Sequence, residues 1–275
     1  MMNNHRYKYF NLLLLLIVFS CTENLLWDDE EPGVMITGTV LLDGVDSPEN
    51  VFIWFKEFDL VVRPDGQGRF TLPLPSLDSP TSGQSISGKI PIYFYVNNYT
   101  VDSVMVEFIN GQLVSPQPEL NDEYELNETI ELEKLLNVSL SVNVVDTERV
   151  EYRTKISSLV DHVSIKAYGR IDGNELVEFS GFLLVDQSTG IPIFSDIPNH
   201  SVVRYIVRSD RSWFTPIVYD EGVLSGDNDY LALPFFVVVQ EGIDHIRNRV
   251  GLEKETYTAN YIHLPFSREG GAVEF

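Results

Sequence analysis

Short apolar runs separated by turn residues recur along the chain from Val34 onward. Residues 51–55 are β-branched or aromatic, the side chains that strands favour. Further runs of this kind occupy residues 34–42, 60–62, 69–72, 92–96, 101–109 and 113–114. Glycine, proline, asparagine and aspartate, which favour turns, fill the intervals between them. This pattern predicts a body built of short strands.

The same pattern continues after residue 135. Apolar residues at even positions from Val138 to Val144 alternate with serine and asparagine, so residues 135–145 predict a strand with one buried and one solvated face. Further strands are predicted at residues 163–168, 176–179, 182–185, 202–207, 214–218, 230–233 and 235–239. Residues 243–250 have helical spacing instead, which predicts one or two helical turns.

These two stretches predict an all-β protein with two β-sandwich domains, Ig-like or transthyretin-like. The boundary is placed near residue 135, where the long alternating strand begins. The first domain then comprises residues 34–135 and the second comprises residues 136–275. With 44% apolar and 12% aromatic residues, the chain has enough side chains to fill two cores.

An Asp65-Gly66 step lies between the strand candidates at 60–62 and 69–72. Glycine accepts the positive φ that a tight turn demands, so this step predicts a β-hairpin. Residues 73–89 are rich in proline, serine and glycine, and we expect a loop there.

Three features, in this order, resemble the carboxypeptidase regulatory-like domain: Val34, Gly38 and Val40; then Ser47-Pro48-Glu49-Asn50-Val51; then Asp65-Gly66-x-Gly68-x-Phe70-x-Leu72. The resemblance covers about 40 residues closely and about 80–100 loosely. It implies a transthyretin-like β-sandwich, with Phe70 in its core. Domains of this family accompany catalytic or transport modules and have no active site of their own. The resemblance therefore implies no catalytic residue.

The first residues are typical of an export signal. Arg6 and Lys8 precede residues 12–19, which form a wholly apolar run. A signal peptide has an apolar core of about 7–15 residues, whereas a membrane-spanning helix needs about 20. The run ends in Val18-Phe19-Ser20-Cys21, which resembles the lipobox of bacterial lipoproteins. This resemblance implies cleavage before Cys21 and lipid on that cysteine; an ordinary secretory signal or a retained anchor is the alternative.

Cys21 is the only cysteine, so the chain forms no internal disulfide. An exported chain with one cysteine is expected to use it, and lipid attachment is the simplest use. Several acyl chains on one residue hold a protein firmly at a membrane. We therefore expect a lipoprotein signal peptide at residues 1–20, an acidic tether at residues 21–33, and a cell-envelope protein anchored to a membrane, with the outer membrane favoured and the leaflet open.

The chain is strongly acidic, with a formal net charge of −22. Cleavage before Cys21 removes Arg6 and Lys8 and makes the mature charge more negative still. Such a field repels nucleic acid, so the sequence predicts no nucleic-acid partner. The acids are spread along the chain, as on a solvated surface; a site for cations or basic ligands is the alternative reading.

No catalytic arrangement is recognisable in the sequence. It contains no Gly-x-Ser-x-Gly motif, and the histidines of the mature chain are widely spaced at His162, His200, His245 and His263. Asp161 precedes His162, but neighbours on a strand point to opposite faces, which argues against a pair. We therefore predict that the protein is not an enzyme. The alternative is an envelope glycan hydrolase that uses two carboxylates, since their separation cannot be read from a sequence.

Two acidic turns, Asp172-Gly173-Asn174-Glu175 and Asp227-Asn228-Asp229, offer the oxygen ligands that calcium prefers. Aspartate and asparagine also occupy turns because they bond their own backbone. Turn formation is the reading we adopt, and we predict no metal and no cofactor.

The best candidate contact surface follows residue 207. The polar turn Arg208-Ser209-Asp210-Arg211 precedes Trp213, and aromatic residues and arginine are enriched at binding hot spots. Arg208, Arg211 and Trp213 are therefore the candidate binding residues, although each arginine could simply pair with an acid. The alternation along residues 214–218 favours a core position for Phe214, while Trp213 fits core and surface about equally.

These features together predict a non-catalytic cell-envelope lipoprotein that binds or scaffolds a protein or glycan partner. Lipid on Cys21 would supply its contact with the membrane.

Overall fold

A computed structural model describes residues 33–44, 47–74, 86–194, 200–224, 229–249 and 271–273. In this part of the chain 59% of residues lie in strands and 6% in helices. The all-β prediction is therefore confirmed. The predicted signal peptide, Cys21 and all of the predicted tether except Gly33 lie outside the described residues. The helices found within the described ranges are too short or too polar to cross a membrane.

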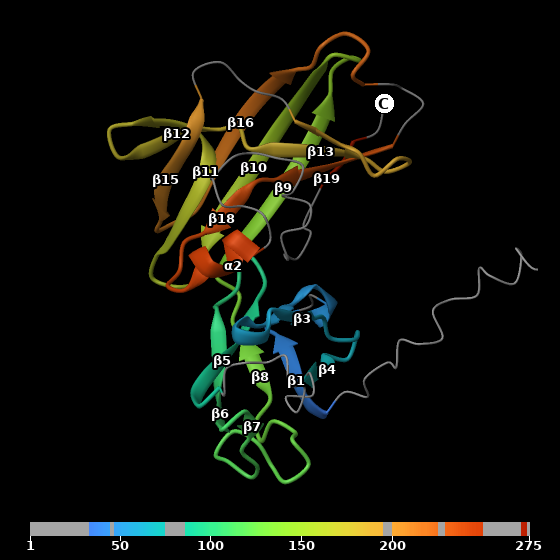
Figure 1. Ribbon diagram of the computed structural model, residues 1–275. Coiled ribbons are helices and arrows are strands. Elements are labelled where there is room, and N and C mark those ends of the chain that lie inside the picture. The colour runs from blue at the N-terminus through green and yellow to red at the C-terminus, as the bar shows by residue number, and fades with distance from the viewer. Residues whose placement is uncertain are drawn as a thin grey trace, which may run out of the picture.

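Residues up to Leu132 form two facing sheets (Figure 1). The five-stranded sheet has the order β3-β2-β5-β6-β7, with strands β2 (Phe52–Phe55), β3 (Leu60–Val62), β5 (Gly88–Tyr95), β6 (Asp102–Ile109) and β7 (Gln112–Leu113). The three-stranded sheet has the order β4-β1-β8, with strands β1 (Val34–Leu42), β4 (Arg69–Leu74) and β8 (Ile130–Leu132). The 3-10 helices η1 (Pro48–Asn50) and η2 (Lys56–Phe58) flank β2. Phe70 on β4 is buried and meets Phe94 on β5 edge to face, with ring centroids 5.6 Å apart, so the two sheets enclose one core.

The turn that carries the family resemblance is held by its own side chains. Asp65 accepts backbone N–H bonds from Gln67 and Arg69, each at 2.9 Å. The bond from the Arg69 backbone is the main reason that the pKa of Asp65 lies below its ordinary value. Gly68 has φ +81°, and a side chain there would come within 2.0 Å of the Val40 carbonyl oxygen. Only glycine allows this close approach of two backbones.

The hairpin prediction for Asp65-Gly66 was wrong. Strand β3 pairs with β2, whereas β4 pairs with β1, so the turn carries the chain from one sheet to the other. Pairing with β1 places Phe70 and Leu72 of β4 in the core between the sheets. A turn motif determines a local change of direction, and burial of these side chains decides the partner strand.

The strands of the second half form three further sheets. The first has the order β16-β10-β9, with strands β9 (Leu136–Val144), β10 (Arg149–Ser158) and β16 (Arg211–Val218). The second has the order β12-β11-β15, with β18 also paired to β11; its strands are β11 (Val163–Asp172), β12 (Glu175–Phe179), β15 (Ser201–Val207) and β18 (Phe236–Val238). The third has the order β14-β13-β17-β19, with strands β13 (Phe182–Asp186), β14 (Pro192–Phe194), β17 (Tyr230–Pro234) and β19 (Gly271–Val273). The sequence pattern did not predict β10, although it is a central strand.

Among the residues that the structure describes, the buried apolar side chains form two clusters, and one of them combines both halves of the chain. Strand β9 begins at Leu136, beside the predicted domain boundary. The cluster built on the first two sheets nevertheless includes Leu183, Leu233, Phe235, Val237, Ile243 and Ile246 from later in the chain. The last two lie on helix α2 (Ile243–Arg249), which confirms the helical prediction for this segment. The division at residue 135 stays a prediction, and these contacts join its two sides.

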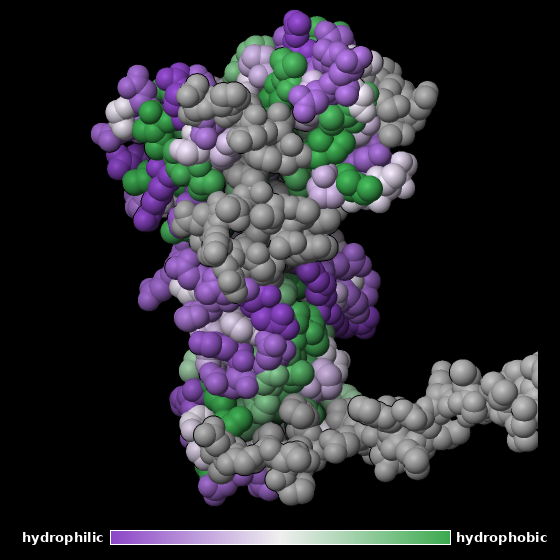
Figure 2. Space-filling model, turned by 45° about the horizontal axis from the view of Figure 1, so that its top comes forward, coloured by the Kyte–Doolittle hydropathy of each residue, from purple (hydrophilic) through white to green (hydrophobic). Residues whose placement is uncertain are grey.

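On the face shown in Figure 2, hydrophilic side chains are interspersed with apolar ones. A surface of this kind fits a chain whose acids are spread along the sequence.

Candidate functional site

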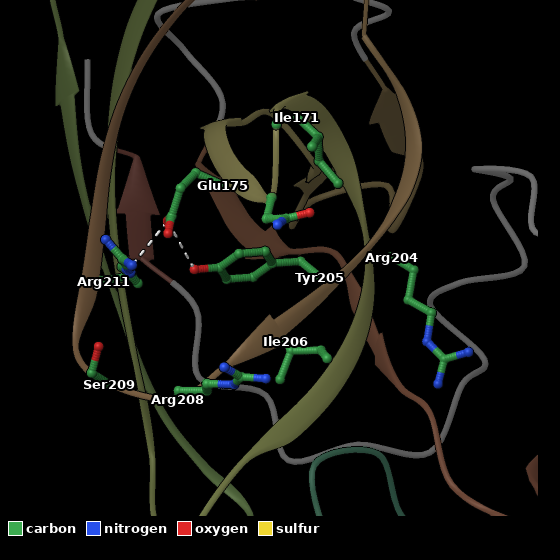
Figure 3. Close-up of a pocket in the computed structure, with 10 residues that line it drawn as sticks. Ile171, Glu175, Arg204, Tyr205, Ile206, Arg208, Ser209 and Arg211 are labelled. Atoms are coloured by element: carbon green, nitrogen blue, oxygen red, sulfur yellow. Dashed lines mark hydrogen bonds and ion pairs between the residues drawn. The ribbon is translucent and has the colours of Figure 1, made fainter.

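A hollow of about 440 Å³ in the second half contains two of the three predicted binding residues. We call it the arginine hollow. Its lining comes from the β11–β12 hairpin, from β15 and from the turn into β16 (Figure 3): Ile171, Gly173, Asn174, Glu175, Arg204, Tyr205, Ile206, Arg208, Ser209 and Arg211. The fold thus brings the polar turn at Arg208–Arg211 next to the acidic turn at residues 172–175.

Glu175 links two other side chains of the hollow. Its carboxylate lies 2.9 Å from the Arg211 guanidinium and accepts a bond from the Tyr205 hydroxyl at 3.5 Å. Figure 3 shows Arg211 and Tyr205 both directed at this carboxylate. Arg211 and Glu175 are both well exposed, so the pair contributes little to stability. The ion pair with Glu175 positions the Arg211 guanidinium at the wall of the hollow.

The other two arginines of the hollow are less engaged. Arg208 is exposed and makes no hydrogen bond or ion pair with any residue that the structure describes. Arg204 donates from Nε to the Ser164 hydroxyl at 2.8 Å. Since a guanidinium carries five N–H donors, most donors on these two side chains stay available. Arg204 is not recognisable as a site residue from the sequence, because a lone arginine within a predicted strand carries no functional pattern.

Trp213 is not a contact residue, and its selection as a binding residue is corrected. Its side chain is only 6% exposed, and the indole N–H donates to the Leu176 carbonyl at 2.7 Å. The ring stacks on Phe179 at 5.6 Å and meets Tyr205 edge to face at 6.5 Å. Trp213 therefore lies behind the hollow and supports Tyr205 in its wall.

The core position expected for Phe214 was also wrong, because its side chain is 54% exposed. Along β16 the buried side chains are Trp213, Thr215 and Ile217, so the even positions face solvent. The alternation was recognised correctly but assigned the wrong phase. A shift of one residue exchanges the two faces of a strand.

The acidic turn closes the β11–β12 hairpin, where Gly173 has φ +61°. Within the described ranges, no group of three histidine, cysteine or acidic residues could hold a metal ion. Asp227 and Asn228 of the second calcium candidate lie outside those ranges. The hairpin turn contributes Gly173, Asn174 and Glu175 to the lining of the hollow.

Asp161 and His162 do form a pair, contrary to the sequence argument. His162 Nδ1 lies 2.9 Å from the Asp161 carboxylate, because both residues precede β11 and are free of strand geometry. Both are exposed. His200 contacts Glu178, and the pKa of Glu178 is lowered, first by its bond from Arg170 and then by His200. None of these residues lines the arginine hollow.

A second hollow, of about 690 Å³, lies beside β1 and β8. Its lining includes Asp43, Glu131 and Glu133 with one cation, Lys134. This composition follows the acidic character of the whole chain. The arginine hollow has the opposite composition, which makes it the more specific candidate site.

No family model matches the sequence, and a comparison with curated proteins found no match. Among solved structures, the chain is similar to a "putative carbohydrate binding protein" from Bacteroides uniformis, with 11% identity and a TM-score of 0.40, over 77% of this chain and 92% of that one. It is also similar to a DUF3823 family protein from Bacteroides ovatus, with 14% identity and a TM-score of 0.32, over 76% and 91% of the two chains. A DUF3823 family protein from Parabacteroides merdae has 11% identity and a TM-score of 0.30, over 75% and 98%. No ligand is inferred from similarities this low.

Proposed function

We propose that this protein is a non-catalytic lipoprotein of the bacterial cell envelope that binds a glycan or protein partner through the arginine hollow. The apolar run at residues 12–19 and the Ser20-Cys21 junction support export and lipid attachment. Lipid on Cys21 anchors the chain, and the β-sandwich body presents the hollow to the partner.

The observation that carries the proposal is the state of Arg208. The chain has 41 acids and 19 lysines and arginines, so an arginine has many carboxylates to pair with. Arg69, Arg170 and Arg249 do pair with acids. Arg208 makes no side-chain bond within the described residues, like exposed Arg149 and Arg153, but unlike these two it lines a hollow. A guanidinium placed in this way is available to a ligand.

The carboxylates of the arginine hollow favour binding over hydrolysis. A glycan hydrolase needs two carboxyl groups about 5–10 Å apart across the scissile bond. Glu175 is the sole acid among the described residues that line the hollow, and it is paired with Arg211. The site therefore lacks the second carboxylate that such a mechanism requires.

Capture of envelope components tests the proposal. The purified full-length protein is immobilised and incubated with polysaccharides and proteins extracted from the envelope. We expect the double variant Arg208→Ala/Arg211→Ala to lose capture. The matched control is Arg149→Ala/Arg153→Ala, which removes the same charge from exposed arginines of β10 that do not line the hollow.

Unchanged capture by the Arg208/Arg211 variant would contradict the proposal. Release of new reducing ends from the extracted glycan by the wild-type protein would favour the hydrolase instead. The melting temperatures of both double variants should stay close to that of the wild type, because all four side chains are exposed.

A further inference from the structure

The arginine hollow carries charge of the opposite sign to the chain as a whole. Its lining includes three arginines and one acid, Glu175, in a chain of net charge −22. Arg204 points away from Tyr205 (Figure 3) and donates to Ser164, so Arg208 and Arg211 are the guanidinium groups considered for a ligand. Guanidinium groups bind carboxylate and sulfate oxygens through parallel N–H bonds, which gives both strength and geometry. The ion pair between Arg211 and Glu175 shows that a carboxylate already fits against one wall of the hollow.

Neutral hydrogen-bonding groups lie beside these arginines. Asn174 and Ser209 line the same hollow and offer an amide and a hydroxyl. Such groups both donate and accept hydrogen bonds, as the hydroxyls of a sugar require, whereas an inorganic anion uses only their donors. Ile206, 41% exposed, adds a small apolar surface for the carbon face of a ring.

The size of the hollow favours a small unit over a protein surface. Its volume of about 440 Å³ lies within the range of about 300–1,000 Å³ that is usual for small-molecule sites. A stable protein interface buries about 1,200–2,000 Å², and an acidic protein would meet the acidic surface of this chain over that whole area. An acidic sugar unit needs only the basic hollow itself.

We infer that the ligand of the arginine hollow is an anionic saccharide, held by its carboxylate or sulfate group against Arg208 and Arg211. This inference rests on the proposed function and adds the chemical class of the ligand. Arg208 makes the main contact with the anionic group, Arg211 turns its remaining N–H donors toward the same group, and Asn174 and Ser209 bind the sugar hydroxyls.

Calorimetric titration with matched saccharides tests the inference. The full-length protein is titrated at low ionic strength with trigalacturonate and with its fully methyl-esterified form, which keeps the sugar backbone and loses the charge. Dextran sulfate and dextran form a second pair, which separates sulfate from carboxylate recognition. We expect binding of at least one charged member, no binding of its neutral counterpart, and weaker binding as salt is added.

Arginine variants locate the binding. Loss of one charge-assisted contact should weaken the affinity of Arg208→Ala for the charged saccharide by about tenfold or more. Arg208→Lys keeps the charge and loses the planar fork, so its affinity should lie between those of the wild type and Arg208→Ala. Arg153→Ala removes the same charge from an exposed position on β10 and should bind like the wild type.

Equal binding of the charged and neutral saccharides would overturn the inference, as would no binding of any of the four. An equal loss of affinity in Arg153→Ala and Arg208→Ala would reduce the effect to net charge and overturn it too. The proposed function is judged separately. Envelope capture that depends on Arg208 and Arg211 but is not inhibited by the charged saccharides would support the proposed binding function. The same result would contradict the inference that the ligand is an anionic saccharide.

Discussion

The buried side chain of Asn97 accepts a hydrogen bond from the backbone N–H of Val238 at 3.2 Å. These two residues lie on opposite sides of the predicted domain boundary. The same carboxamide donates to the Phe236 carbonyl at 2.9 Å. From the other side of the boundary, the side chain of Gln240 bonds the backbone of the first half. It donates to the Tyr99 carbonyl at 2.7 Å and accepts from the Val101 N–H at 3.0 Å. Two side-chain amides thus satisfy backbone groups where the turn after β5 meets β18.

Replacement of Asn97 should therefore be costly. Asn97→Ala leaves a buried N–H and a buried carbonyl without their partner, and we expect a loss of about 2–4 kcal/mol in the free energy of unfolding. Urea titration followed by fluorescence measures it. Asn143→Ala is the control, because Asn143 is exposed and bonds only to Glu151, and its cost should stay within about 0.5 kcal/mol. Equal effects of the two substitutions would contradict the role of Asn97.

Trp213 and Phe214 are neighbours with opposite expected behaviour. Trp213→Ala removes a buried ring that packs on Phe179 and should cost about 3–5 kcal/mol. Phe214→Ala removes an exposed ring and should cost less than about 1 kcal/mol. Thermal unfolding of both variants checks the phase of β16. A larger loss for Phe214→Ala would mean that the strand faces the other way.

Alanine substitutions at Gly68 and Gly173 distinguish the cost of an unfavourable backbone conformation from the cost of a steric clash. Both have positive φ, but an added Cβ meets the Val40 carbonyl at Gly68 and nothing within 4 Å at Gly173. Gly173→Ala should cost about 1–2 kcal/mol from its backbone conformation alone. Gly68→Ala should cost clearly more, because the contact between β1 and this turn must open. Comparable melting temperatures for the two variants would contradict this.

The hydroxyls of Tyr152 and Tyr219 lie 2.7 Å apart in the interior, which predicts a loss of stability in alkali. Burial raises the pKa of Tyr219 from 10.0 to about 12. A raised pKa in the folded state means that this contribution is fully present below pH 10.0 and is lost as the pH rises toward about 12. We expect the melting temperature to fall across that interval and to fall less steeply in Tyr219→Phe. Identical slopes for the two proteins would refute this assignment.

Lipid attachment at Cys21 is tested in the bacterial envelope. Cys21→Ala removes the acceptor, so the protein should appear in the soluble envelope fraction or keep its uncleaved leader and its larger size. Fractionation with immunoblotting distinguishes these products from the wild type. A Cys21→Ala protein of unchanged size that remains in the membrane fraction would refute lipidation.

Strand positions could largely be predicted from the sequence, because alternation and β-branched side chains act within a few residues. Four strands were missed. Three of them are only three residues long, β8, β14 and β19, and a run this short shows no alternation. The fourth is β10, where charged residues on the exposed face obscured the apolar positions of the other face. At the candidate site, Arg208 and Arg211 were identified from their polar turn. Arg204 and Tyr205 were not, because nothing within strand β15 distinguishes a side chain that lines a hollow from one that lies elsewhere.

The sequence alone was sufficient for the all-β class, for the helix at its predicted place and for the turn residues, since each depends on the local backbone and on side-chain period. Only the tertiary structure decided which strands pair across the Asp65-Gly66 turn and which face of β16 is buried. It also decided that Glu175 meets both Tyr205, 30 residues away in the chain, and Arg211. These outcomes depend on partners distant in sequence, since burying the apolar face of each strand selects one arrangement among several that are equally compatible with the local pattern.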